Sequence, residues 1–240
     1  MKKISLAIMI LLGSFSMASA ELGVNVGVTA QLGTMEATGN EGNTTAGSTR
    51  QSKSAEALFG TAGFFAEKEL NFLPGPLGRI SIGFDNIGHD ISLGTATNHV
   101  NSHLGSSAET FVANPTEANG GAQSFTNQAS ADITGFKTVY ATLGLTDWLY
   151  VKAGNVTVDV TTTEKMESGG AYPNTTLDGT VIGAGFHHER DNGLFMRLEV
   201  NQYDIDGVTL QNNGGDTTGR SVQLTDVDGT TARFSIGKAF

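Results

Sequence analysis

Five charged side chains stand in segments that otherwise alternate between apolar residues and small or polar ones. They are Asp85, Lys152, Arg197, Glu199 and Arg233. Each falls on the non-apolar face of its segment, among Gly, Ser, Thr and Asn. Two acids and three bases on such faces can pair in a low-dielectric interior, where an unpaired charge is costly. We interpret the five as a network that fills an enclosed space; the alternative is the lining of a narrow path for ions or solutes.

Residues typical of enzymes are few. His99 and His103 are four apart, a spacing that brings two ligands together on a helix, but no helical period is evident around them. Ser102 lies near His103, so a Ser/His pair on a surface loop is the least favoured hypothesis. The chain has no Gly-x-Ser-x-Gly elbow, no His-Glu-x-x-His motif and no phosphate-binding glycine loop. We predict no enzyme, no cofactor and no metal.

The elements that carry the five charges are predicted to be β-strands with one apolar face. The first runs after Ala20, where six apolar residues recur at a period of two between Leu22 and Leu32. The same alternation predicts eight strands, at about 22–33, 55–68, 78–88, 133–146, 149–160, 177–187, 194–204 and 230–240. The facing of the second strand is ambiguous, because Leu58 and Phe64 compete with Phe59 and Phe65 for the apolar face.

The connections between these strands alternate between short and long. Short ones lie at 69–77, 146–148 and 188–193, and long ones, rich in Gly, Asn, Thr and Ser, at about 34–54, 89–132, 161–176 and 205–229. Ten strands are the alternative if 89–132 contains an extra hairpin, for which Thr110-Phe111-Val112 is the only hint. A soluble sandwich or jelly roll also alternates, but it places its apolar residues inside.

Composition narrows the class of protein. The 240 residues include 32 Gly and no Cys, which excludes a disulfide scaffold, a Cys-ligated metal and a Cys nucleophile. A formal net charge of −10 disfavours nucleic acid as a partner. Lys2 and Lys3, an apolar run from Ile4 to Leu12, and Ala18-Ser19-Ala20 have the order of a secretory signal peptide. We therefore expect residues 1–20 to be a cleaved signal peptide and 21–240 to be one domain.

The even number of strands, their length of about 9 to 12 residues and the alternation of short and long connections resemble small Gram-negative outer-membrane β-barrels of the OmpA, OmpX and OmpW type. The C-terminal strand adds to the resemblance, since Phe234, Ile236 and Phe240 form an alternating apolar pattern like the signal read by the outer-membrane assembly machinery. The resemblance implies an all-β fold, a closed antiparallel transmembrane barrel with short periplasmic turns and long extracellular loops. It also implies a location in the outer membrane, among lipid and lipopolysaccharide.

Two further expectations follow from a barrel in a membrane. Phe72, Trp148, Tyr150 and Phe240 fall near the predicted periplasmic strand ends, where aromatic rings form a girdle. Eight strands enclose a space just wide enough for side chains, so we expect a filled lumen and a structural or surface-contact role for acidic extracellular loops. A narrow porin-type channel, or a conduit for apolar molecules, is the alternative function.

The segment 204–228 is the most acidic of these loops. Asp204-Ile205-Asp206-Gly207 and Asp226-Val227-Asp228-Gly229 suggest hard-oxygen ligands for a divalent cation, but Asp-Gly is also a hairpin turn signal and the turn is the stronger interpretation. Val208 and Leu210 are expected to pair with Val222 and Leu224 in an extracellular hairpin. A cation bridge from these acids to lipopolysaccharide phosphates is a hypothesis that a chelator can test.

Overall fold

The computed structural model describes residues 22–42, 52–88, 90–102, 123–165, 171–211 and 221–240. Nearly all of these residues are in strands, and one short 3-10 helix, η1 (Gly75–Arg79), lies between two of them. The strands are β1 (Val24–Gly42), β2 (Ser52–Glu69), β3 (Ile80–Ile87), β4 (Ile91–Ser102), β5 (Gln123–Gly144), β6 (Leu149–Lys165), β7 (Thr175–Glu189), β8 (Leu194–Ile205), β9 (Val208–Gln211) and β10 (Ser221–Ala239). Within the described residues, no helix has the length and apolar character needed to cross a membrane.

The sheet closes on itself. Neighbouring strands pair antiparallel in the order β1-β2-β3-β5-β6-β7-β8-β10, and β10 pairs with β1. Eight strands surround the barrel, because β4 continues the line of β3 along β5, and β9 continues β8 along β10. The predicted closed eight-stranded barrel is confirmed. The described parts of segment 89–132 form β4 and the first part of β5, which pair with each other, and residues 110–112 lie outside the described residues.

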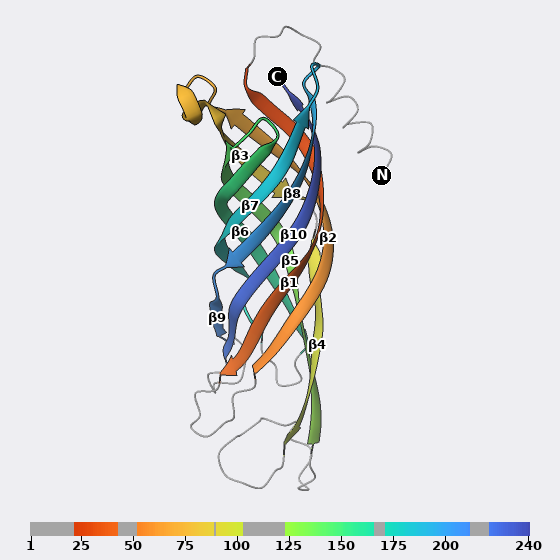
Figure 1. Ribbon diagram of the computed structural model, residues 1–240. Helices are drawn as coiled ribbons and strands as arrows, with labels where there is room; N and C mark the ends of the chain where they lie inside the picture. Colours follow the sequence, from red (N-terminus) through yellow and green to blue (C-terminus); the bar gives the residue numbers. More distant parts are fainter. Residues whose placement is uncertain (1–21, 43–51, 89, 103–122, 166–170, 212–220) are drawn as a thin grey trace, which may run out of the picture.

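The two ends of the barrel differ. Tight connections at 70–79, 145–148 and 190–193 lie together with the C terminus at one end, which we call the turn end (top of Figure 1). At the other, the hairpin end, strands run well past their predicted limits, and the β4–β5 hairpin extends furthest (Figure 1). The predicted hairpin of the acidic segment is present, since Val208 pairs with Leu224 and Leu210 with Val222. The long connections are therefore shorter than expected from the sequence.

Alternation decides which residues face the lumen. Leu198 and Val200 lie on the outer surface of β8, and Glu199 and Asn201 are buried inside. On β2, where the sequence left two choices, Leu58 is 81% exposed outside and Phe65 is 3% exposed inside. The choice comes from the neighbouring strand: Phe65 lies directly opposite Gly27, and a Cβ atom on Gly27 would lie 2.6 Å from its ring.

This pairing of an inward ring with an inward glycine recurs around the barrel. The glycine lacks a side chain, so the ring lies across it and fills the lumen without a clash. The directly opposed pairs are Gly27 with Phe65, Gly33 with Phe59, Gly83 and Gly154 with Tyr140, Gly185 with Tyr150, and Gly237 with Phe195. The high glycine content thus makes room for large side chains in a barrel too narrow for them otherwise.

The polarity of the wall reverses half-way along the barrel. Towards the turn end, the outer face is apolar and the lumen is polar, as the sequence predicted. Towards the hairpin end the lumen is apolar, with Met35, Phe136 and Val158 buried, and the outer face carries exposed residues such as Glu36 and Asp178. The expectation of a polar lumen along the whole barrel was therefore wrong for the hairpin end. A wall bathed in water on its outside must place its apolar residues inside.

Candidate functional site

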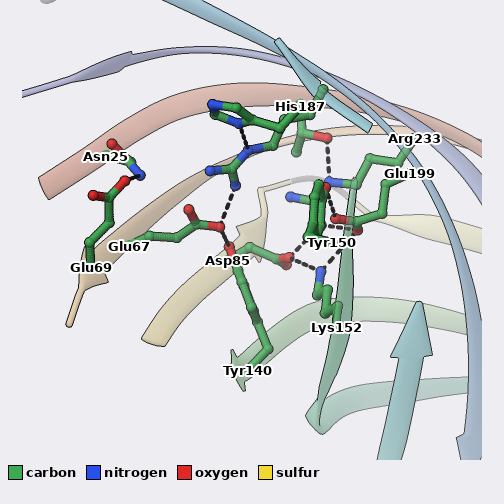
Figure 2. Close-up of polar contacts among 12 residues, drawn as sticks. Asn25, Glu67, Glu69, Asp85, Tyr140, Tyr150, Lys152, His187, Glu199 and Arg233 are labelled. Atoms are coloured by element: carbon green, nitrogen blue, oxygen red, sulfur yellow. Dashed lines mark hydrogen bonds and ion pairs between the residues drawn. The ribbon is translucent and has the colours of Figure 1, made fainter. Parts of the chain in front are cut away.

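A buried ionic network fills the turn-end half of the lumen. Asp85, on β3, is 2% exposed and accepts hydrogen bonds from Arg233 Nη1 at 2.5 Å and from Lys152 Nζ at 3.5 Å (Figure 2). Lys152 Nζ also donates to Glu199 Oε1 at 3.1 Å, and the Tyr150 hydroxyl donates to Glu199 Oε2 at 2.7 Å. Because these residues come from β3, β6, β8 and β10, the network links strands from all round the barrel.

A second acid extends the network across the lumen. Glu67, on β2, accepts hydrogen bonds from Arg197 Nη1 at 2.5 Å and from the Tyr140 hydroxyl at 2.8 Å. Arg197 Nε in turn donates to Nδ1 of His187 at 2.9 Å. Lys152 lies over the Tyr140 ring, 4.1 Å from its centroid. It therefore joins the contacts around Glu67 to those around Asp85 and Glu199.

The network is balanced in charge and buried. Its three acids, Glu67, Asp85 and Glu199, face its three bases, Lys152, Arg197 and Arg233, and all six side chains are at most 11% exposed. Aromatic rings pack against the cations; the Arg197 guanidinium lies 4.7 Å from the Phe195 ring centroid. Such a network is stable only as a whole, since the loss of one partner leaves an uncompensated charge in a low dielectric.

An apolar compartment follows towards the hairpin end. Its lining comes from every strand around the wall and includes Met35, Phe59, Ile87, Ile91, Ile133, Phe136, Val156, Val158, Val160, Leu177, Val181, Tyr203, Ile205 and Val227. These side chains form one continuous cluster, in which Val156 is fully buried and the Phe136 and Tyr203 rings meet edge to face at 5.2 Å. The lumen therefore has an ionic half and an apolar half.

The apolar belt on the outer surface has the height of a membrane. On β1 it runs from Leu22 to Leu32, beyond which Thr34 and Glu36 face outwards. A strand of this length, rising about 3.4 Å per residue and tilted by about 40°, spans roughly 25 Å, the apolar band of a transmembrane β-barrel. On other strands the exposed apolar residues nearest the hairpin end include Leu58, Val139, Ile182 and Val200. The protein is a closed eight-stranded β-barrel with the outer apolar belt of a transmembrane barrel.

In outer-membrane barrels the short turns face the periplasm and the long hairpins face outwards, so we expect the turn end to be the periplasmic end. Phe72 is exposed in the first turn, and Trp148 is 54% exposed and stacks on Phe186; their place in an aromatic girdle stays a prediction. Tyr150 was wrongly assigned to the girdle. It is 6% exposed inside the lumen, because it alternates with the outward Leu149 and Val151 and so shares the inner face with Lys152.

The structure brings together all five predicted lumen charges, and sequence reasoning missed Glu67, Tyr140 and His187. Glu67 was missed because both faces of β2 are apolar, which hid the inward register. A signal existed: Glu67 is two residues from Phe65 and therefore on the same face.

Phe234 and Ile236 lie on the outer face of β10 near the turn end, close to the final residue, Phe240. The amide of Phe240 donates to the Val24 carbonyl at 2.9 Å. Their part in assembly stays a prediction.

Several predictions fall where the structure describes no side chains. The signal peptide, residues 1–20, and His103 lie outside the described residues. The backbone of His99 and Ser102 is in β4, but their side chains are not among those described.

Comparisons with known proteins give fold likeness only. No protein-family profile and no curated protein matches the chain. Among solved structures, it is similar to the outer membrane protein OprG from Pseudomonas aeruginosa, at 10% identity over 92% of this chain and 98% of that one, with a TM-score of 0.47. It is also similar to the outer membrane protease OmpT from Escherichia coli (9% identity, 95% and 100% covered, TM-score 0.43) and to AlkL (12%, 94% and 93%, 0.41).

Proposed function

We propose that this outer-membrane barrel takes small apolar molecules from the extracellular side into the outer leaflet of a Gram-negative outer membrane. The observation that carries the proposal is the change of polarity inside the lumen. A cluster of apolar side chains fills the lumen towards the hairpin end, and the ionic network fills it towards the turn end. An apolar molecule is stabilised by burial in the apolar half of the lumen. To pass the ionic half, it would have to separate paired charges.

The wall offers a way out of the compartment. The ladder between β2 and β3 ends at the pair Gly63 and Ile87, and within the described part of the chain β4 pairs only with β5. Residues 54–61 of β2 therefore have a ladder with β1 but none with β4. This part of β2 includes the lipid-facing Leu58 and the inward Phe59, and the inward Ile91 begins β4. We propose that an apolar molecule leaves the lumen between β2 and β4, where the described strands share no ladder.

The ionic network argues against a porin-type channel. A hydrated ion in the lumen would need to displace side chains that are held by several short contacts each, such as Asp85 and Glu199. We expect the purified barrel in a planar bilayer to give no steady single-channel steps. Regular steps whose size changes with Arg197→Gln would support the channel in place of the conduit.

A transfer assay tests the conduit directly. Cells that carry or lack the protein are exposed to an uncharged naphthylamine dye that fluoresces in lipid, and the rate of fluorescence increase is measured. The double variant Val156→Thr and Val158→Thr keeps the shape of the lumen but adds hydroxyl groups to its apolar lining. The control places the same change on the lipid-facing surface, with Val139→Thr and Val151→Thr.

We expect the protein to speed dye entry, the inner variant to lose most of that gain, and the outer variant to keep it. Dye entry that is independent of the protein, or equal for the two variants when both are folded at equal amounts, contradicts the proposal.

A surface-contact role is the second candidate function. It is favoured by the exposed acids beyond the apolar belt, such as Glu36 and Asp204. Adhesion of cells to a cationic surface, lost on neutralising those acids, would support it.

A further inference from the structure

A layer of uncharged polar side chains lies between the ionic and the apolar half of the lumen. All its members are at most 6% exposed. Thr138 on β5 lies two residues from Phe136 of the apolar cluster and two from Tyr140 of the ionic network. Asn201 on β8 has the same position between Tyr203 and Glu199. The polar layer consists of Gln31, Thr61, Thr138, Asn201 and Thr231.

The register of the strands brings most of this polar layer together. Gln31 lies directly opposite Thr61, and Thr231 lies directly opposite Asn201. Gln31 also lies opposite Arg233, which is two residues from Thr231 and on the same face. Four of the five residues are therefore on the neighbouring strands β2, β1, β10 and β8 and form one patch on the inner wall.

Part of the polar layer has no hydrogen-bond partner within the chain that the structure describes. The unpartnered atoms include Nε2 of Gln31 and the hydroxyl oxygens of Thr61 and Thr138, all of them buried. Arg233, which lies opposite Gln31, donates from Nε to the Thr29 hydroxyl at 2.6 Å. Buried polar groups are almost always hydrogen-bonded, so these atoms point to a guest that supplies donors and acceptors.

We propose that the polar layer binds the head of an amphipathic molecule whose head is polar but uncharged, as in a long-chain alcohol. The chain of the molecule lies among the apolar side chains next to the layer. A hydroxyl group accepts from Gln31 Nε2 and at the same time donates to a threonine hydroxyl such as that of Thr61. Met35, in the apolar cluster, has an unbranched side chain that can change rotamer and make room for the chain. The proposal rests on the conduit proposed above and names the class of molecule that the conduit takes.

The ionic network favours a neutral head over an ionised one. Each of its bases, Lys152, Arg197 and Arg233, already contacts an acid. A carboxylate at the polar layer would lose its hydration and gain only neutral donors, which is costly. An alkane is disfavoured for the opposite reason, because it leaves the buried amide and hydroxyl groups unpaired.

Nuclear magnetic resonance titration of the full mature chain in detergent micelles tests the head and the chain separately. Decanol, decane and ionised decanoate are added at matched concentrations in the micelle. The side-chain amide of Gln31 reports on the head, and the backbone amide of Val156, in the apolar half, reports on the chain. The inner variant, Gln31→Met with Thr61→Val, removes polar groups of the layer. The control, Gln202→Met with Thr180→Val, makes the same exchange on the exposed outer wall.

We expect decanol to shift both signals saturably and to bind at least about fivefold more tightly than decane or decanoate. In the inner variant, followed at Val156, decanol and decane should bind equally, whereas the control should keep the preference for decanol. Both variants should fold like the natural chain, since neither loses a hydrogen bond of the ionic network.

The outcomes separate this inference from the conduit. Equal binding of decanol and decane to the natural chain, or an undiminished preference in the inner variant, overturns the inference and leaves the conduit standing, because the lumen still takes an apolar chain. Tighter binding of decanoate overturns it in favour of an ionised head. If neither decanol nor decane shifts the Val156 signal, the conduit is contradicted together with the inference.

Discussion

Replacing Asp85 by Asn tests the ionic network at its centre. Asp85 lies between Arg233 at 2.5 Å and Lys152 at 3.5 Å, and the change leaves both bases to share Glu199, which is 3.1 Å from Lys152 and 3.9 Å from Arg233. Breaking a buried ion pair by removing one partner costs about 3–5 kcal/mol. For a chain of this size, each kcal/mol lowers the melting temperature by about 2–4 °C, so we expect a fall of roughly 6–20 °C.

The assay is the loss of β-sheet circular dichroism on heating in detergent micelles. Asp191→Asn, in an exposed turn, is the control, and its melting temperature should equal that of the natural chain. Adding Arg233→Gln to Asp85→Asn removes the excess positive charge and should recover part of the loss. A melting temperature for Asp85→Asn within about 2 °C of the natural chain would refute the network as a stabilising seal, because a buried acid between two bases cannot be removed at so little cost.

Three other outcomes follow from the packing. Gly83→Ala places a Cβ atom 2.5 Å from the Tyr140 ring and should cost about 1–3 kcal/mol in denaturant titrations. Gly60→Ala is the matched control and should be close to neutral, because its Cβ would lie 3.1 Å from the flexible end of Leu32 and no nearer than 3.9 Å to backbone. Trp148→Ala should lose roughly 0.5–1.5 kcal/mol from its stacked ring pair, measured in the same way, and no change would exclude an anchoring role. In chelator without lipid, Glu36→Gln should raise the unfolding free energy by about 0.2–1 kcal/mol, since it removes repulsion from two opposed acids; a fall would contradict that repulsion.

The membrane-facing part of the wall could be predicted residue by residue. A period of two needs no knowledge of distant contacts, so the outward position of Leu198 and the inward position of Arg197 follow from neighbouring residues alone. The reversal of polarity beyond the belt was also present in the sequence, in the order Leu32, Thr34, Glu36 on one face and Met35 on the other. It was missed because Gly- and Thr-rich strands that continue beyond the membrane have the composition of loops.

The sequence by itself determined that the chain alternates and that Asp85, Lys152, Arg197, Glu199 and Arg233 lie on faces turned to the lumen, because these depend on local spacing. Only the tertiary structure decided that Phe65 faces the lumen, since its place depends on Gly27 across the ladder, and that Glu67 joins Arg197 from a strand 130 residues away. The pairing of Glu36 with Asp228 and the end of the β2–β3 ladder at Gly63 and Ile87 were likewise decided by register and by strand order. Register is a property of two strands at once, so no single segment contains it.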